Sequence, residues 1–382
     1  MSGAESRLTG PVRVVGVGLL GASIALGLRA RGVDVILSDA SPTNVRIAID
    51  YGAGRSAGDA DEPQLIVVCV PPDVTASVIV RELSAYPRSV VTDVASVKLP
   101  VLDAVRAAGG DVTRYVGSHP LAGREKGGPM AGRADLFLGR PWVVAGHPDI
   151  SYQTASAVDD LILDLGAVLV EMSAAEHDAS VALISHAPQV VSTLMARRLV
   201  AAPEAAVNLS GGGLRDVTRV AGSDPGLWVQ ILGANAAPTA EVLRGVRDDL
   251  DEVIAALDAA AADSAPASGA GAASAVASAG GGAGWRRALA ETLAGGNAGV
   301  ARIPGKHGQD RRYAQLVVMV DDSPGELARL LTELGEDGVN LEDLRLEHSP
   351  GAQIGLAEIA VLPETLDTVT RALAARGWRI AG

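Results

Sequence analysis

A glycine-spaced turn near the start of the chain sets the fold of the N-terminal part. The apolar run Val12–Val15 leads into Gly16-Val17-Gly18-Leu19-Leu20-Gly21, and the helix-like stretch Ala22–Arg29 follows. In such a turn the first glycine allows the tight bend, the second lets the backbone approach a pyrophosphate, and the third lets the helix lie against the strand. The helix N-terminus attracts the phosphate charge. The phrase predicts a dinucleotide-binding βαβ unit, although this spacing alone is a weak signal.

Two further positions strengthen this interpretation and indicate which nucleotide binds. The apolar run 33–37 ends in Ser38 and Asp39, eighteen residues beyond Gly21. An acidic side chain there accepts hydrogen bonds from both ribose hydroxyls and repels a 2′-phosphate, so we expect NAD rather than NADP. The run 65–70 ends in two prolines, which stop the strand where loops at the carboxyl edge of the sheet meet the cofactor. The expected cofactor-binding residues are Gly16, Gly18, Leu19, Leu20, Gly21, Asp39, Val70, Pro71 and Ser96.

Short Val- and Ile-rich runs alternate with helix-like segments up to about Trp142. This alternation is typical of βαβ units and of a mostly parallel sheet with helices on both faces. We therefore predict a Rossmann-like, doubly wound α/β domain over residues 10–172. Its expected strands are 12–17, 33–38, 65–70, 89–93, 114–118 and 142–145.

From Ser173 the pattern changes to long helices. Ser173 and Glu176 form a capping box that starts one helix, which Pro188 is expected to kink. A second helix is expected from 223 to about 257, with a break near Pro238. We assign residues 173–308 to an all-α substrate-binding and dimerisation domain, because its apolar positions exceed what one small sheet can cover. These positions include Val190, Leu194, Leu199, Leu227, Ile231 and Leu232. The alternative to a homodimer interface is a bundle within one chain.

The C-terminal part contains a biased segment and a distinct unit. Residues 259–284 are almost entirely Ala, Gly and Ser, so we expect a flexible insertion there, followed by a short helix over 285–293. The final unit, 311–382, shows strand 313–320, helix 326–335, strands 339–347 and 354–362, helix 366–376 and a last strand at 378–380. This βαββα order predicts a small ferredoxin-like α/β sandwich.

Composition excludes several classes of function. The formal net charge is −13 and aromatic residues make up 3%, which argues against a nucleic-acid-binding protein. The single cysteine, Cys69, cannot form an internal disulfide, so we expect a reducing, cytoplasmic location. The uncharged stretch 14–28 resembles a signal peptide, but its glycines lie where a βα turn needs them, and we expect no membrane partner. No H-x-x-x-H or C-x-x-C spacing supports a metal site.

The leading catalytic candidate is His119, which Pro120 fixes in the phrase Ser118-His119-Pro120-Leu121-Ala122-Gly123. A histidine titrates near neutrality and can take a proton from an alcohol while hydride leaves the same carbon. Ser96 follows the preceding strand and can hydrogen-bond the nicotinamide or the reacting hydroxyl; a helix N-cap is its ordinary role.

The helical half supplies further candidates. Arg219 and Asp216 lie three residues apart, and an arginine held by an aspartate can bind a carboxylate in a bidentate manner, although a plain surface ion pair has the same spacing. His186 and Glu125 are candidates for shaping the pocket. We interpret His177 and His307 as structural or peripheral.

At this point the chain resembles the prephenate and arogenate dehydrogenases. The similarity rests on phrases in matching order, which are Gly16-x-Gly18-Leu-Leu-Gly21-x-Ser23, Asp93-Val-x-Ser96-Val-Lys98, Ser118-His119-Pro120-x-Ala-Gly123-x-Glu125, Glu176-His177-Asp178 with Ile184-Ser-His186, and Gly211-Gly-Gly-x-Arg215-Asp216-x-Thr-Arg219. The C-terminal unit resembles an ACT domain, whose expected amino-acid-binding residues are Asp322, Gly325 and Asn340. The Ala/Gly/Ser segment is not part of the family pattern.

The resemblance implies a reaction and a role for each residue. His119 would be the base for the ring hydroxyl, Ser96 its hydrogen-bond partner, and Arg219 the group that binds the ring carboxylate. His186, Asp216 and Glu125 would shape the pocket, and tyrosine would be the effector of the ACT-like unit. The implied activity is NAD-dependent oxidative decarboxylation of prephenate. The alternatives are the same reaction on arogenate, a β-hydroxyacid or imine reductase, and a non-enzymatic redox or amino-acid sensor.

Overall fold

The computed structural model describes residues 6–122, 128–264, 282–303, 313–341, 343–348 and 354–381. The chain divides into two compact units. One comprises Met1–Ala201 and Thr218–Gly245, and the other comprises Ala202–Val217 and Val246–Gly382.

The first unit contains an eight-stranded sheet in the order β3-β2-β1-β4-β5-β6-β7-β8. Its strands are β1 (Val12–Val15), β2 (Val35–Ser38), β3 (Arg55–Ser56), β4 (Leu65–Val68), β5 (Val90–Asp93), β6 (Tyr115–Pro120), β7 (Pro141–Gly146) and β8 (Val168–Ser173). The pairs from β3 to β6 are parallel, with Val12 opposite Val35 on one side and Leu65 on the other. The predicted Rossmann-like sheet is therefore confirmed.

Three features of this sheet differ from the predicted pattern. β7 pairs antiparallel with β6, and β8 pairs parallel with β7, so the last two strands run opposite to the first six. β3 and β8 were not predicted, because β3 has only two residues and β8 has only partly buried or exposed side chains. A strand without a buried apolar run leaves little periodic signal.

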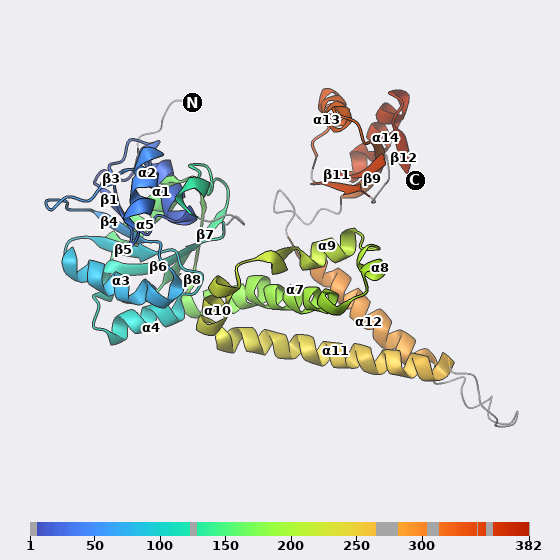
Figure 1. Cartoon of the computed structure of the whole chain (residues 1–382), viewed down its shortest axis with the longest axis horizontal. Helices are drawn as coiled ribbons and strands as arrows, with labels where there is room; N and C mark the ends of the chain where they lie inside the picture. The colour runs from blue at the N-terminus through green and yellow to red at the C-terminus, as the bar shows by residue number, and fades with distance from the viewer. Residues whose placement is uncertain are drawn as a thin grey trace, which may run out of the picture. The chain divides into compact units, whose positions relative to one another are not determined.

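Helices cover both faces of the sheet (Figure 1). They are α1 (Leu19–Arg29), α2 (Pro42–Asp50), α3 (Pro72–Ala85), α4 (Leu99–Ala107) and α5 (Tyr152–Asp164). Successive residues of each central strand point to opposite faces. Val14 and Val67 accordingly pack with α1, α2 and α5 in one core, whereas Ile66 and Val68 pack with α3 and α4 in the other. Strands buried on both faces explain the continuous apolar runs in the sequence.

A long helical run follows the sheet. Ser173 caps α6 (Ala174–Val181) in the predicted capping box with Glu176. A π-helical segment, η3 (Ala182–His186), then interrupts the α-helical ladder before α7 (Ala187–Arg198), which has Pro188 in its first turn. Pro188 has no N–H to donate to the preceding turn, so the expected irregularity appears as a π-helical segment.

By length and mean hydropathy alone, the run Ala174–Ala201 could cross a membrane. It carries His177, Asp178 and His186, all buried and hydrogen-bonded to neighbouring parts of this unit. Ionisable groups are costly in a bilayer. The burial of these three side chains against the rest of the unit therefore argues against a membrane-spanning role for this run.

The first unit continues with short helices and the start of a long one. η5 (Arg219–Gly222) contacts α7, and α10 (Pro225–Ala234) contacts α3. The helical ladder breaks at Asn235, and α11 (Ala236–Ser264) begins with Pro238 in its first turn. The break thus lies just before the expected position, because proline is tolerated in a first turn.

The second unit holds helices and a four-stranded sheet. Its helices include α8 (Glu204–Val207), α9 (Gly212–Thr218, shared with the first unit at its end) and α12 (Gly282–Val300). The expectation of a flexible insertion from 259 is wrong for residues 259–264, which continue α11 because alanine is the best helix former. Residues 265–281 lie outside the described residues. α12 is longer than the predicted 285–293.

The C-terminal sheet has the order β10-β11-β9-β12 with antiparallel neighbours. The elements are β9 (Ala314–Asp321), α13 (Glu326–Glu336), β10 (Asp343–His348), β11 (Ile354–Val361), α14 (Leu366–Ala375) and β12 (Arg379–Ala381). They follow the predicted order. β10 starts later than predicted, because Gly338, at φ +69°, ends α13 and the Val339 N–H then bonds back to Leu334.

Candidate active site

The glycine turn has the geometry of a pyrophosphate cradle. Gly16 has φ +94°, and a Cβ there would lie 2.3 Å from the Cys69 carbonyl oxygen. A Cβ on Gly21 would lie 1.9 Å from the Gly16 oxygen, so only glycine lets α1 pack against the turn. A Cβ on Gly18 would meet nothing within 4 Å. Gly18 is thus not needed for packing, and the open space beside it, at the N-terminus of α1, suits a bound phosphate group.

The other expected cofactor-binding residues surround this turn. One carboxylate oxygen of Asp39 accepts the Val17 N–H at 2.8 Å, and the other accepts the Ser41 N–H at 2.8 Å and the Asn44 amide at 3.4 Å. Three of roughly four acceptor positions are therefore used, which leaves capacity for one ribose hydroxyl rather than both. The Val70 side chain lies beside the Gly16 position, and Pro71 is the N-cap of α3.

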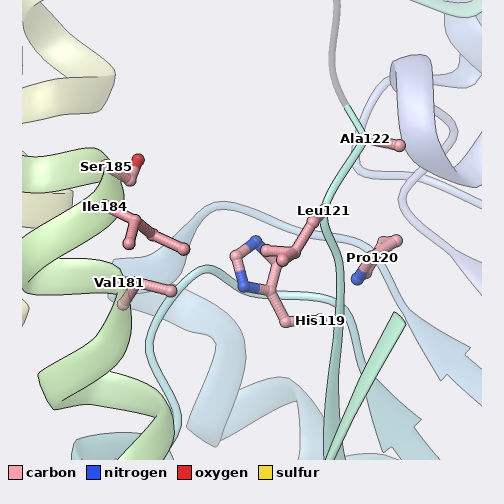
Figure 2. Close-up of a pocket in the computed structure, with 7 residues that line it drawn as sticks. All are labelled: His119, Pro120, Leu121, Ala122, Val181, Ile184 and Ser185. Atoms are coloured by element: carbon pink, nitrogen blue, oxygen red, sulfur yellow. The ribbon is translucent and has the colours of Figure 1, made fainter. Parts of the chain in front are cut away.

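His119 lies at the carboxyl end of β6 and lines a cavity of about 330 Å³ (Figure 2). The strand side of this cavity consists of His119, Pro120, Leu121 and Ala122, and the helix side of Val181, Ile184 and Ser185. The helix-side residues belong to α6 and the π-helical segment η3. The irregular helix therefore faces the imidazole across the cavity, whose lining is mainly apolar with His119 and Ser185 as its polar side chains.

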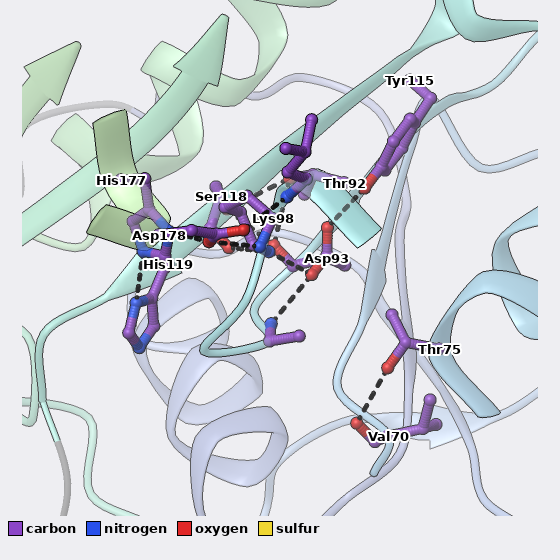
Figure 3. A network of polar contacts seen from close by, with 12 residues as sticks. Val70, Thr75, Thr92, Asp93, Lys98, Tyr115, Ser118, His119, His177 and Asp178 are labelled. Carbon is purple, nitrogen blue, oxygen red and sulfur yellow. Dashed lines mark hydrogen bonds and ion pairs between the residues drawn. The ribbon is translucent and has the colours of Figure 1, made fainter. Parts of the chain in front are cut away.

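A hydrogen-bonded chain leads away from the cavity behind His119 (Figure 3). His119 Nδ1 lies 2.9 Å from His177 Nε2, and His177 Nδ1 lies 2.8 Å from Asp178 Oδ1. Asp178 also accepts the backbone N–H groups of Lys98 at 2.8 Å and Leu99 at 2.9 Å, where α4 begins. His177 and Asp178 are 0% and 3% exposed. This series of hydrogen bonds thus ends at the Asp178 carboxylate, which two backbone N–H groups hold in place.

A second buried network holds the strand end that carries His119. The Lys98 ammonium donates to Asp93 and, at 2.7 Å, to the carbonyl of Ser118. The Tyr115 hydroxyl donates to the other oxygen of Asp93 at 2.8 Å. The Ser118 hydroxyl donates to the Asp93 carbonyl and accepts from the Trp142 indole. Every bond in this network connects β5, β6, β7 or the loop after β5, so it fixes the main chain on which His119 is mounted.

The electrostatics of the site favour neutral histidines. Burial lowers the pKa of His119 well below 6.5, and His177, Lys98 and His186 lower it further. Burial also lowers the pKa of His186 to about 4, against the opposing effect of Asp178. A neutral imidazole can accept a proton, which is the state a general base needs.

The structure brings some of the predicted residues to this cavity and not others. Ser96 lies in the loop after β5 and is partly buried. Its alternative role as a helix cap is wrong, because Lys98 is the N-cap of α4. His186 is 1% exposed and bonds Asn235 at 3.0 Å, just outside the cavity lining. Arg219 starts η5 with an exposed side chain and does not line the cavity.

The remaining predicted residues belong to the second unit or lie outside the described residues. Asp216 is exposed on α9. In the C-terminal sheet domain, Asp322 and Asn340 are exposed, and Gly325 caps α13 with φ +97°. Glu125 and His307 lie outside the described residues.

The sequence analysis missed the residues behind His119. Of the two roles expected for His177, structural or peripheral, the peripheral one is wrong, since its ring contacts that of His119 edge to face at 5.1 Å between centroids. Asp178, Lys98 and Asp93 were noted only as parts of matching phrases. The available signal was the pair His177 and Asp178, which follows directly after the capping box. The local sequence does not indicate which strand these side chains contact.

Comparison with known proteins places this site in context. The family model for the prephenate dehydrogenase nucleotide-binding domain matches residues 24–171, and that for the prephenate dehydrogenase dimerisation domain matches residues 173–265. The first match begins after the glycine turn, so the evidence for the turn comes from its geometry. A probable prephenate dehydrogenase of Streptomyces niveus is 34% identical over 96% of this chain and 98% of its own length.

Two solved structures are also similar. Prephenate dehydrogenase of Aquifex aeolicus, in complex with hydroxyphenyl propionate and NAD+, matches with a TM-score of 0.62 and 25% identity, over 67% of this chain and 93% of that one. Arogenate dehydrogenase of Synechocystis matches with a TM-score of 0.57 and 27% identity, over 65% and 92%.

Proposed function

The chain belongs to the prephenate dehydrogenase family, and from this premise we propose that it catalyses the NAD-dependent oxidative decarboxylation of prephenate to 4-hydroxyphenylpyruvate. The observation that carries the proposal is the position of His119, a neutral imidazole at the carboxyl end of β6, opening onto a cavity of about 330 Å³. Ligands of open α/β sheets bind outside the carboxyl ends of the strands.

The glycine turn supports NAD as the cofactor. Gly16, Gly18 and the N-terminus of α1 would hold the pyrophosphate, with Leu19 and Leu20 in the first helical turn, and Asp39 would bind the ribose. When bound, NAD supplies the acceptor for the hydride.

The residues of the chain then need to orient the substrate and accept one proton. His119 takes the proton of the ring hydroxyl while hydride leaves the same carbon, which becomes a carbonyl. Ser96 hydrogen-bonds that hydroxyl. The bond to the ring carboxylate breaks and CO2 leaves. The electron pair of that bond passes through the ring to the carbonyl oxygen, which takes the proton back from His119 as the ring becomes aromatic. We assign the ring carboxylate to Arg219, whose exposed side chain lies outside the lining of the described cavity; it would orient this carboxylate and would not stabilise the charge that disappears. His186, which is buried and bonds Asn235 just outside the cavity lining, would shape the pocket.

The second candidate substrate is arogenate, which the similarity to the Synechocystis enzyme supports. It carries an amino group where prephenate carries a side-chain keto group. Ser185 and apolar side chains form the helix side of the described cavity lining, and Glu125 lies outside the described residues. The 34% identity to a probable prephenate dehydrogenase over 96% of this chain supports prephenate as the first candidate.

The assay that tests the proposal follows NADH absorbance with NAD and either substrate. We expect faster turnover with prephenate, and His119→Asn should lower kcat by about 10²- to 10⁴-fold with unchanged NAD affinity. His147→Asn is a matched control, because His147 is a buried histidine that bonds the Tyr115 carbonyl and not His119. Faster turnover of arogenate would establish the alternative, and no NADH with either substrate would overturn both.

The same proposal includes an assembly, an effector and a location. The matched dimerisation domain supports a homodimer, and the family's biosynthetic role supports a cytoplasmic enzyme. The C-terminal ferredoxin-like sheet supports an ACT-like module that binds tyrosine beside Asp322, Gly325 and Asn340. Heat released on titrating tyrosine into the full chain would support that assignment, and its absence would contradict it.

A further inference from the structure

We propose that His177 and Asp178 are positioning residues that hold His119 in a single tautomer, with the proton on Nδ1 and the free lone pair of Nε2 facing the cavity. The inference deepens the proposed function and rests on it for its catalytic meaning. It also assigns which atom donates in each hydrogen bond from His119 through His177 to Asp178.

The direction is set at Asp178. This carboxylate accepts two backbone N–H groups at the start of α4, where the helix N-terminus favours a negative charge. An ionised carboxylate only accepts hydrogen bonds. His177 Nδ1, at 2.8 Å, must therefore be the donor.

The donor in the second hydrogen bond, between His177 and His119, follows from the first. A neutral His177 that donates from Nδ1 has an unprotonated Nε2, which can only accept. His119 Nδ1, at 2.9 Å, must then donate to it. The proton of a neutral His119 is thus on Nδ1, and Nε2 is left as the proton acceptor. Among the described residues, the His119 side chain has no hydrogen-bond partner other than His177, so Nε2 is available to a substrate in the cavity.

The surrounding charges agree with this arrangement. Burial lowers the pKa of His119, and His177, Lys98 in the loop before α4 and His186 in the π-helical segment η3 lower it further. Asp93 pairs with Lys98, and Asp178 is the carboxylate that reaches the histidine chain. When Nε2 takes a proton, the new positive charge on His119 is connected through His177 to the negative charge of Asp178. The pair therefore sets the tautomer before the reaction and stabilises the charge formed during it.

The decisive measurement is the ¹⁵N NMR spectrum of the histidine-labelled full chain without substrate. We expect His119 Nδ1 to be protonated and Nε2 to be unprotonated in the native protein. His177→Leu should raise the fraction of His119 with the proton on Nε2, because it removes the acceptor of the His119 Nδ1–H bond. A native protein with the proton on His119 Nε2, or with a doubly protonated His177, would overturn the proposal.

Kinetics supply the second readout. Asp178→Asn should lower kcat by about 10²- to 10⁴-fold, with KM for the substrate and Kd for NAD within about threefold of native. His177→Gln should retain more activity than His177→Leu, since the glutamine oxygen can accept from His119 Nδ1. His147→Gln is the control for loss of a buried histidine, with native kcat expected. A folded Asp178→Asn variant with native kcat would also overturn the proposal.

The two measurements separate this inference from the proposed reaction. The NMR experiment needs no turnover, so it reads the tautomer even if the protein oxidises neither prephenate nor arogenate. If thermal unfolding shows that Asp178→Asn is not folded, the spectrum of the native protein still shows which nitrogen of His119 carries the proton.

Discussion

Among the individual residues, the candidate site depends on His119, which must be neutral and must also contact the residues that orient it. His119 is surrounded by the sheet, by His177 and by the positive charge of Lys98, and all of these disfavour its protonated form. Desolvation penalises the charged imidazole, and a like charge nearby acts in the same direction. The penalty matters for function, because a protonated His119 cannot accept the substrate proton.

This environment predicts the pH dependence of turnover. The pKa of His119 lies well below its ordinary 6.5, so the fraction of neutral base stays near unity as pH falls from about 8 to about 6.5. We expect kcat/KM for prephenate to be constant over this range and to fall only at lower pH, as His119 becomes protonated. Steady-state kinetics across this range measure it, with thermal unfolding at each pH to verify the fold. A midpoint of the fall near 6.5 would contradict the burial argument.

At the element scale, the strand-to-helix turn before α1 combines a packing requirement with a binding requirement. Gly21 lies against the Gly16 carbonyl, whereas the space around the Gly18 Cβ position is open. The same turn therefore contains one glycine that the fold needs and one that only a ligand needs. Gly18 also has φ −69°, a value that other residues adopt easily.

The two glycines give a matched pair of variants. Gly21→Ala should destabilise the ligand-free protein by about 1–3 kcal/mol, because its Cβ overlaps the Gly16 oxygen. Gly18→Ala should change the ligand-free stability by less than about 0.5 kcal/mol, yet weaken NAD binding by about tenfold or more. Thermal unfolding without ligand and calorimetric titration with NAD measure the two effects. Native NAD affinity in Gly18→Ala would show that the pyrophosphate does not approach the turn there.

At the scale of the whole molecule, the first unit leaves large apolar side chains on its helices uncovered. Leu194 and Met195 of α7 are 52% and 45% exposed, and Val229 of α10 is 71% exposed. Ile231, expected at the dimer interface, is instead 7% exposed and is covered by its own chain. Apolar groups gathered on one helical domain are typical of an interface, and a second copy of the chain is the partner that the dimerisation domain suggests.

This surface predicts the effect of introducing charge. Leu194→Glu and Val229→Glu should shift the protein from dimer to monomer at micromolar concentration, because an unpaired carboxylate in an apolar interface is strongly unfavourable. Leu163→Glu is the control, since Leu163 is 41% exposed on α5 of the sheet domain. Light scattering measures the mass of each variant. A monomeric native protein, or a dimer that both substitutions leave intact, would argue against this surface.

The sequence by itself determined the elements whose cause is local. The glycine turn, the buried parallel strands, the capping box at Ser173 and the order of the C-terminal unit all follow from backbone sterics, short-range hydrogen bonds and hydrophobic periodicity. His119 was identifiable because it follows a strand in the same phrase. The direction of β7 could not be predicted, since it depends on which strand β7 pairs with in the folded sheet.

The tertiary structure alone decided what stands behind His119. His177 is 58 residues further along the chain, and the Lys98 backbone bonds Asp178 across 80 residues. No local spacing records a contact between side chains of different elements, because that contact depends on how the helix after β8 packs against the loop after β5. Because of this packing, His177, which the sequence indicated only as structural or peripheral, is the hydrogen-bond partner of the candidate base.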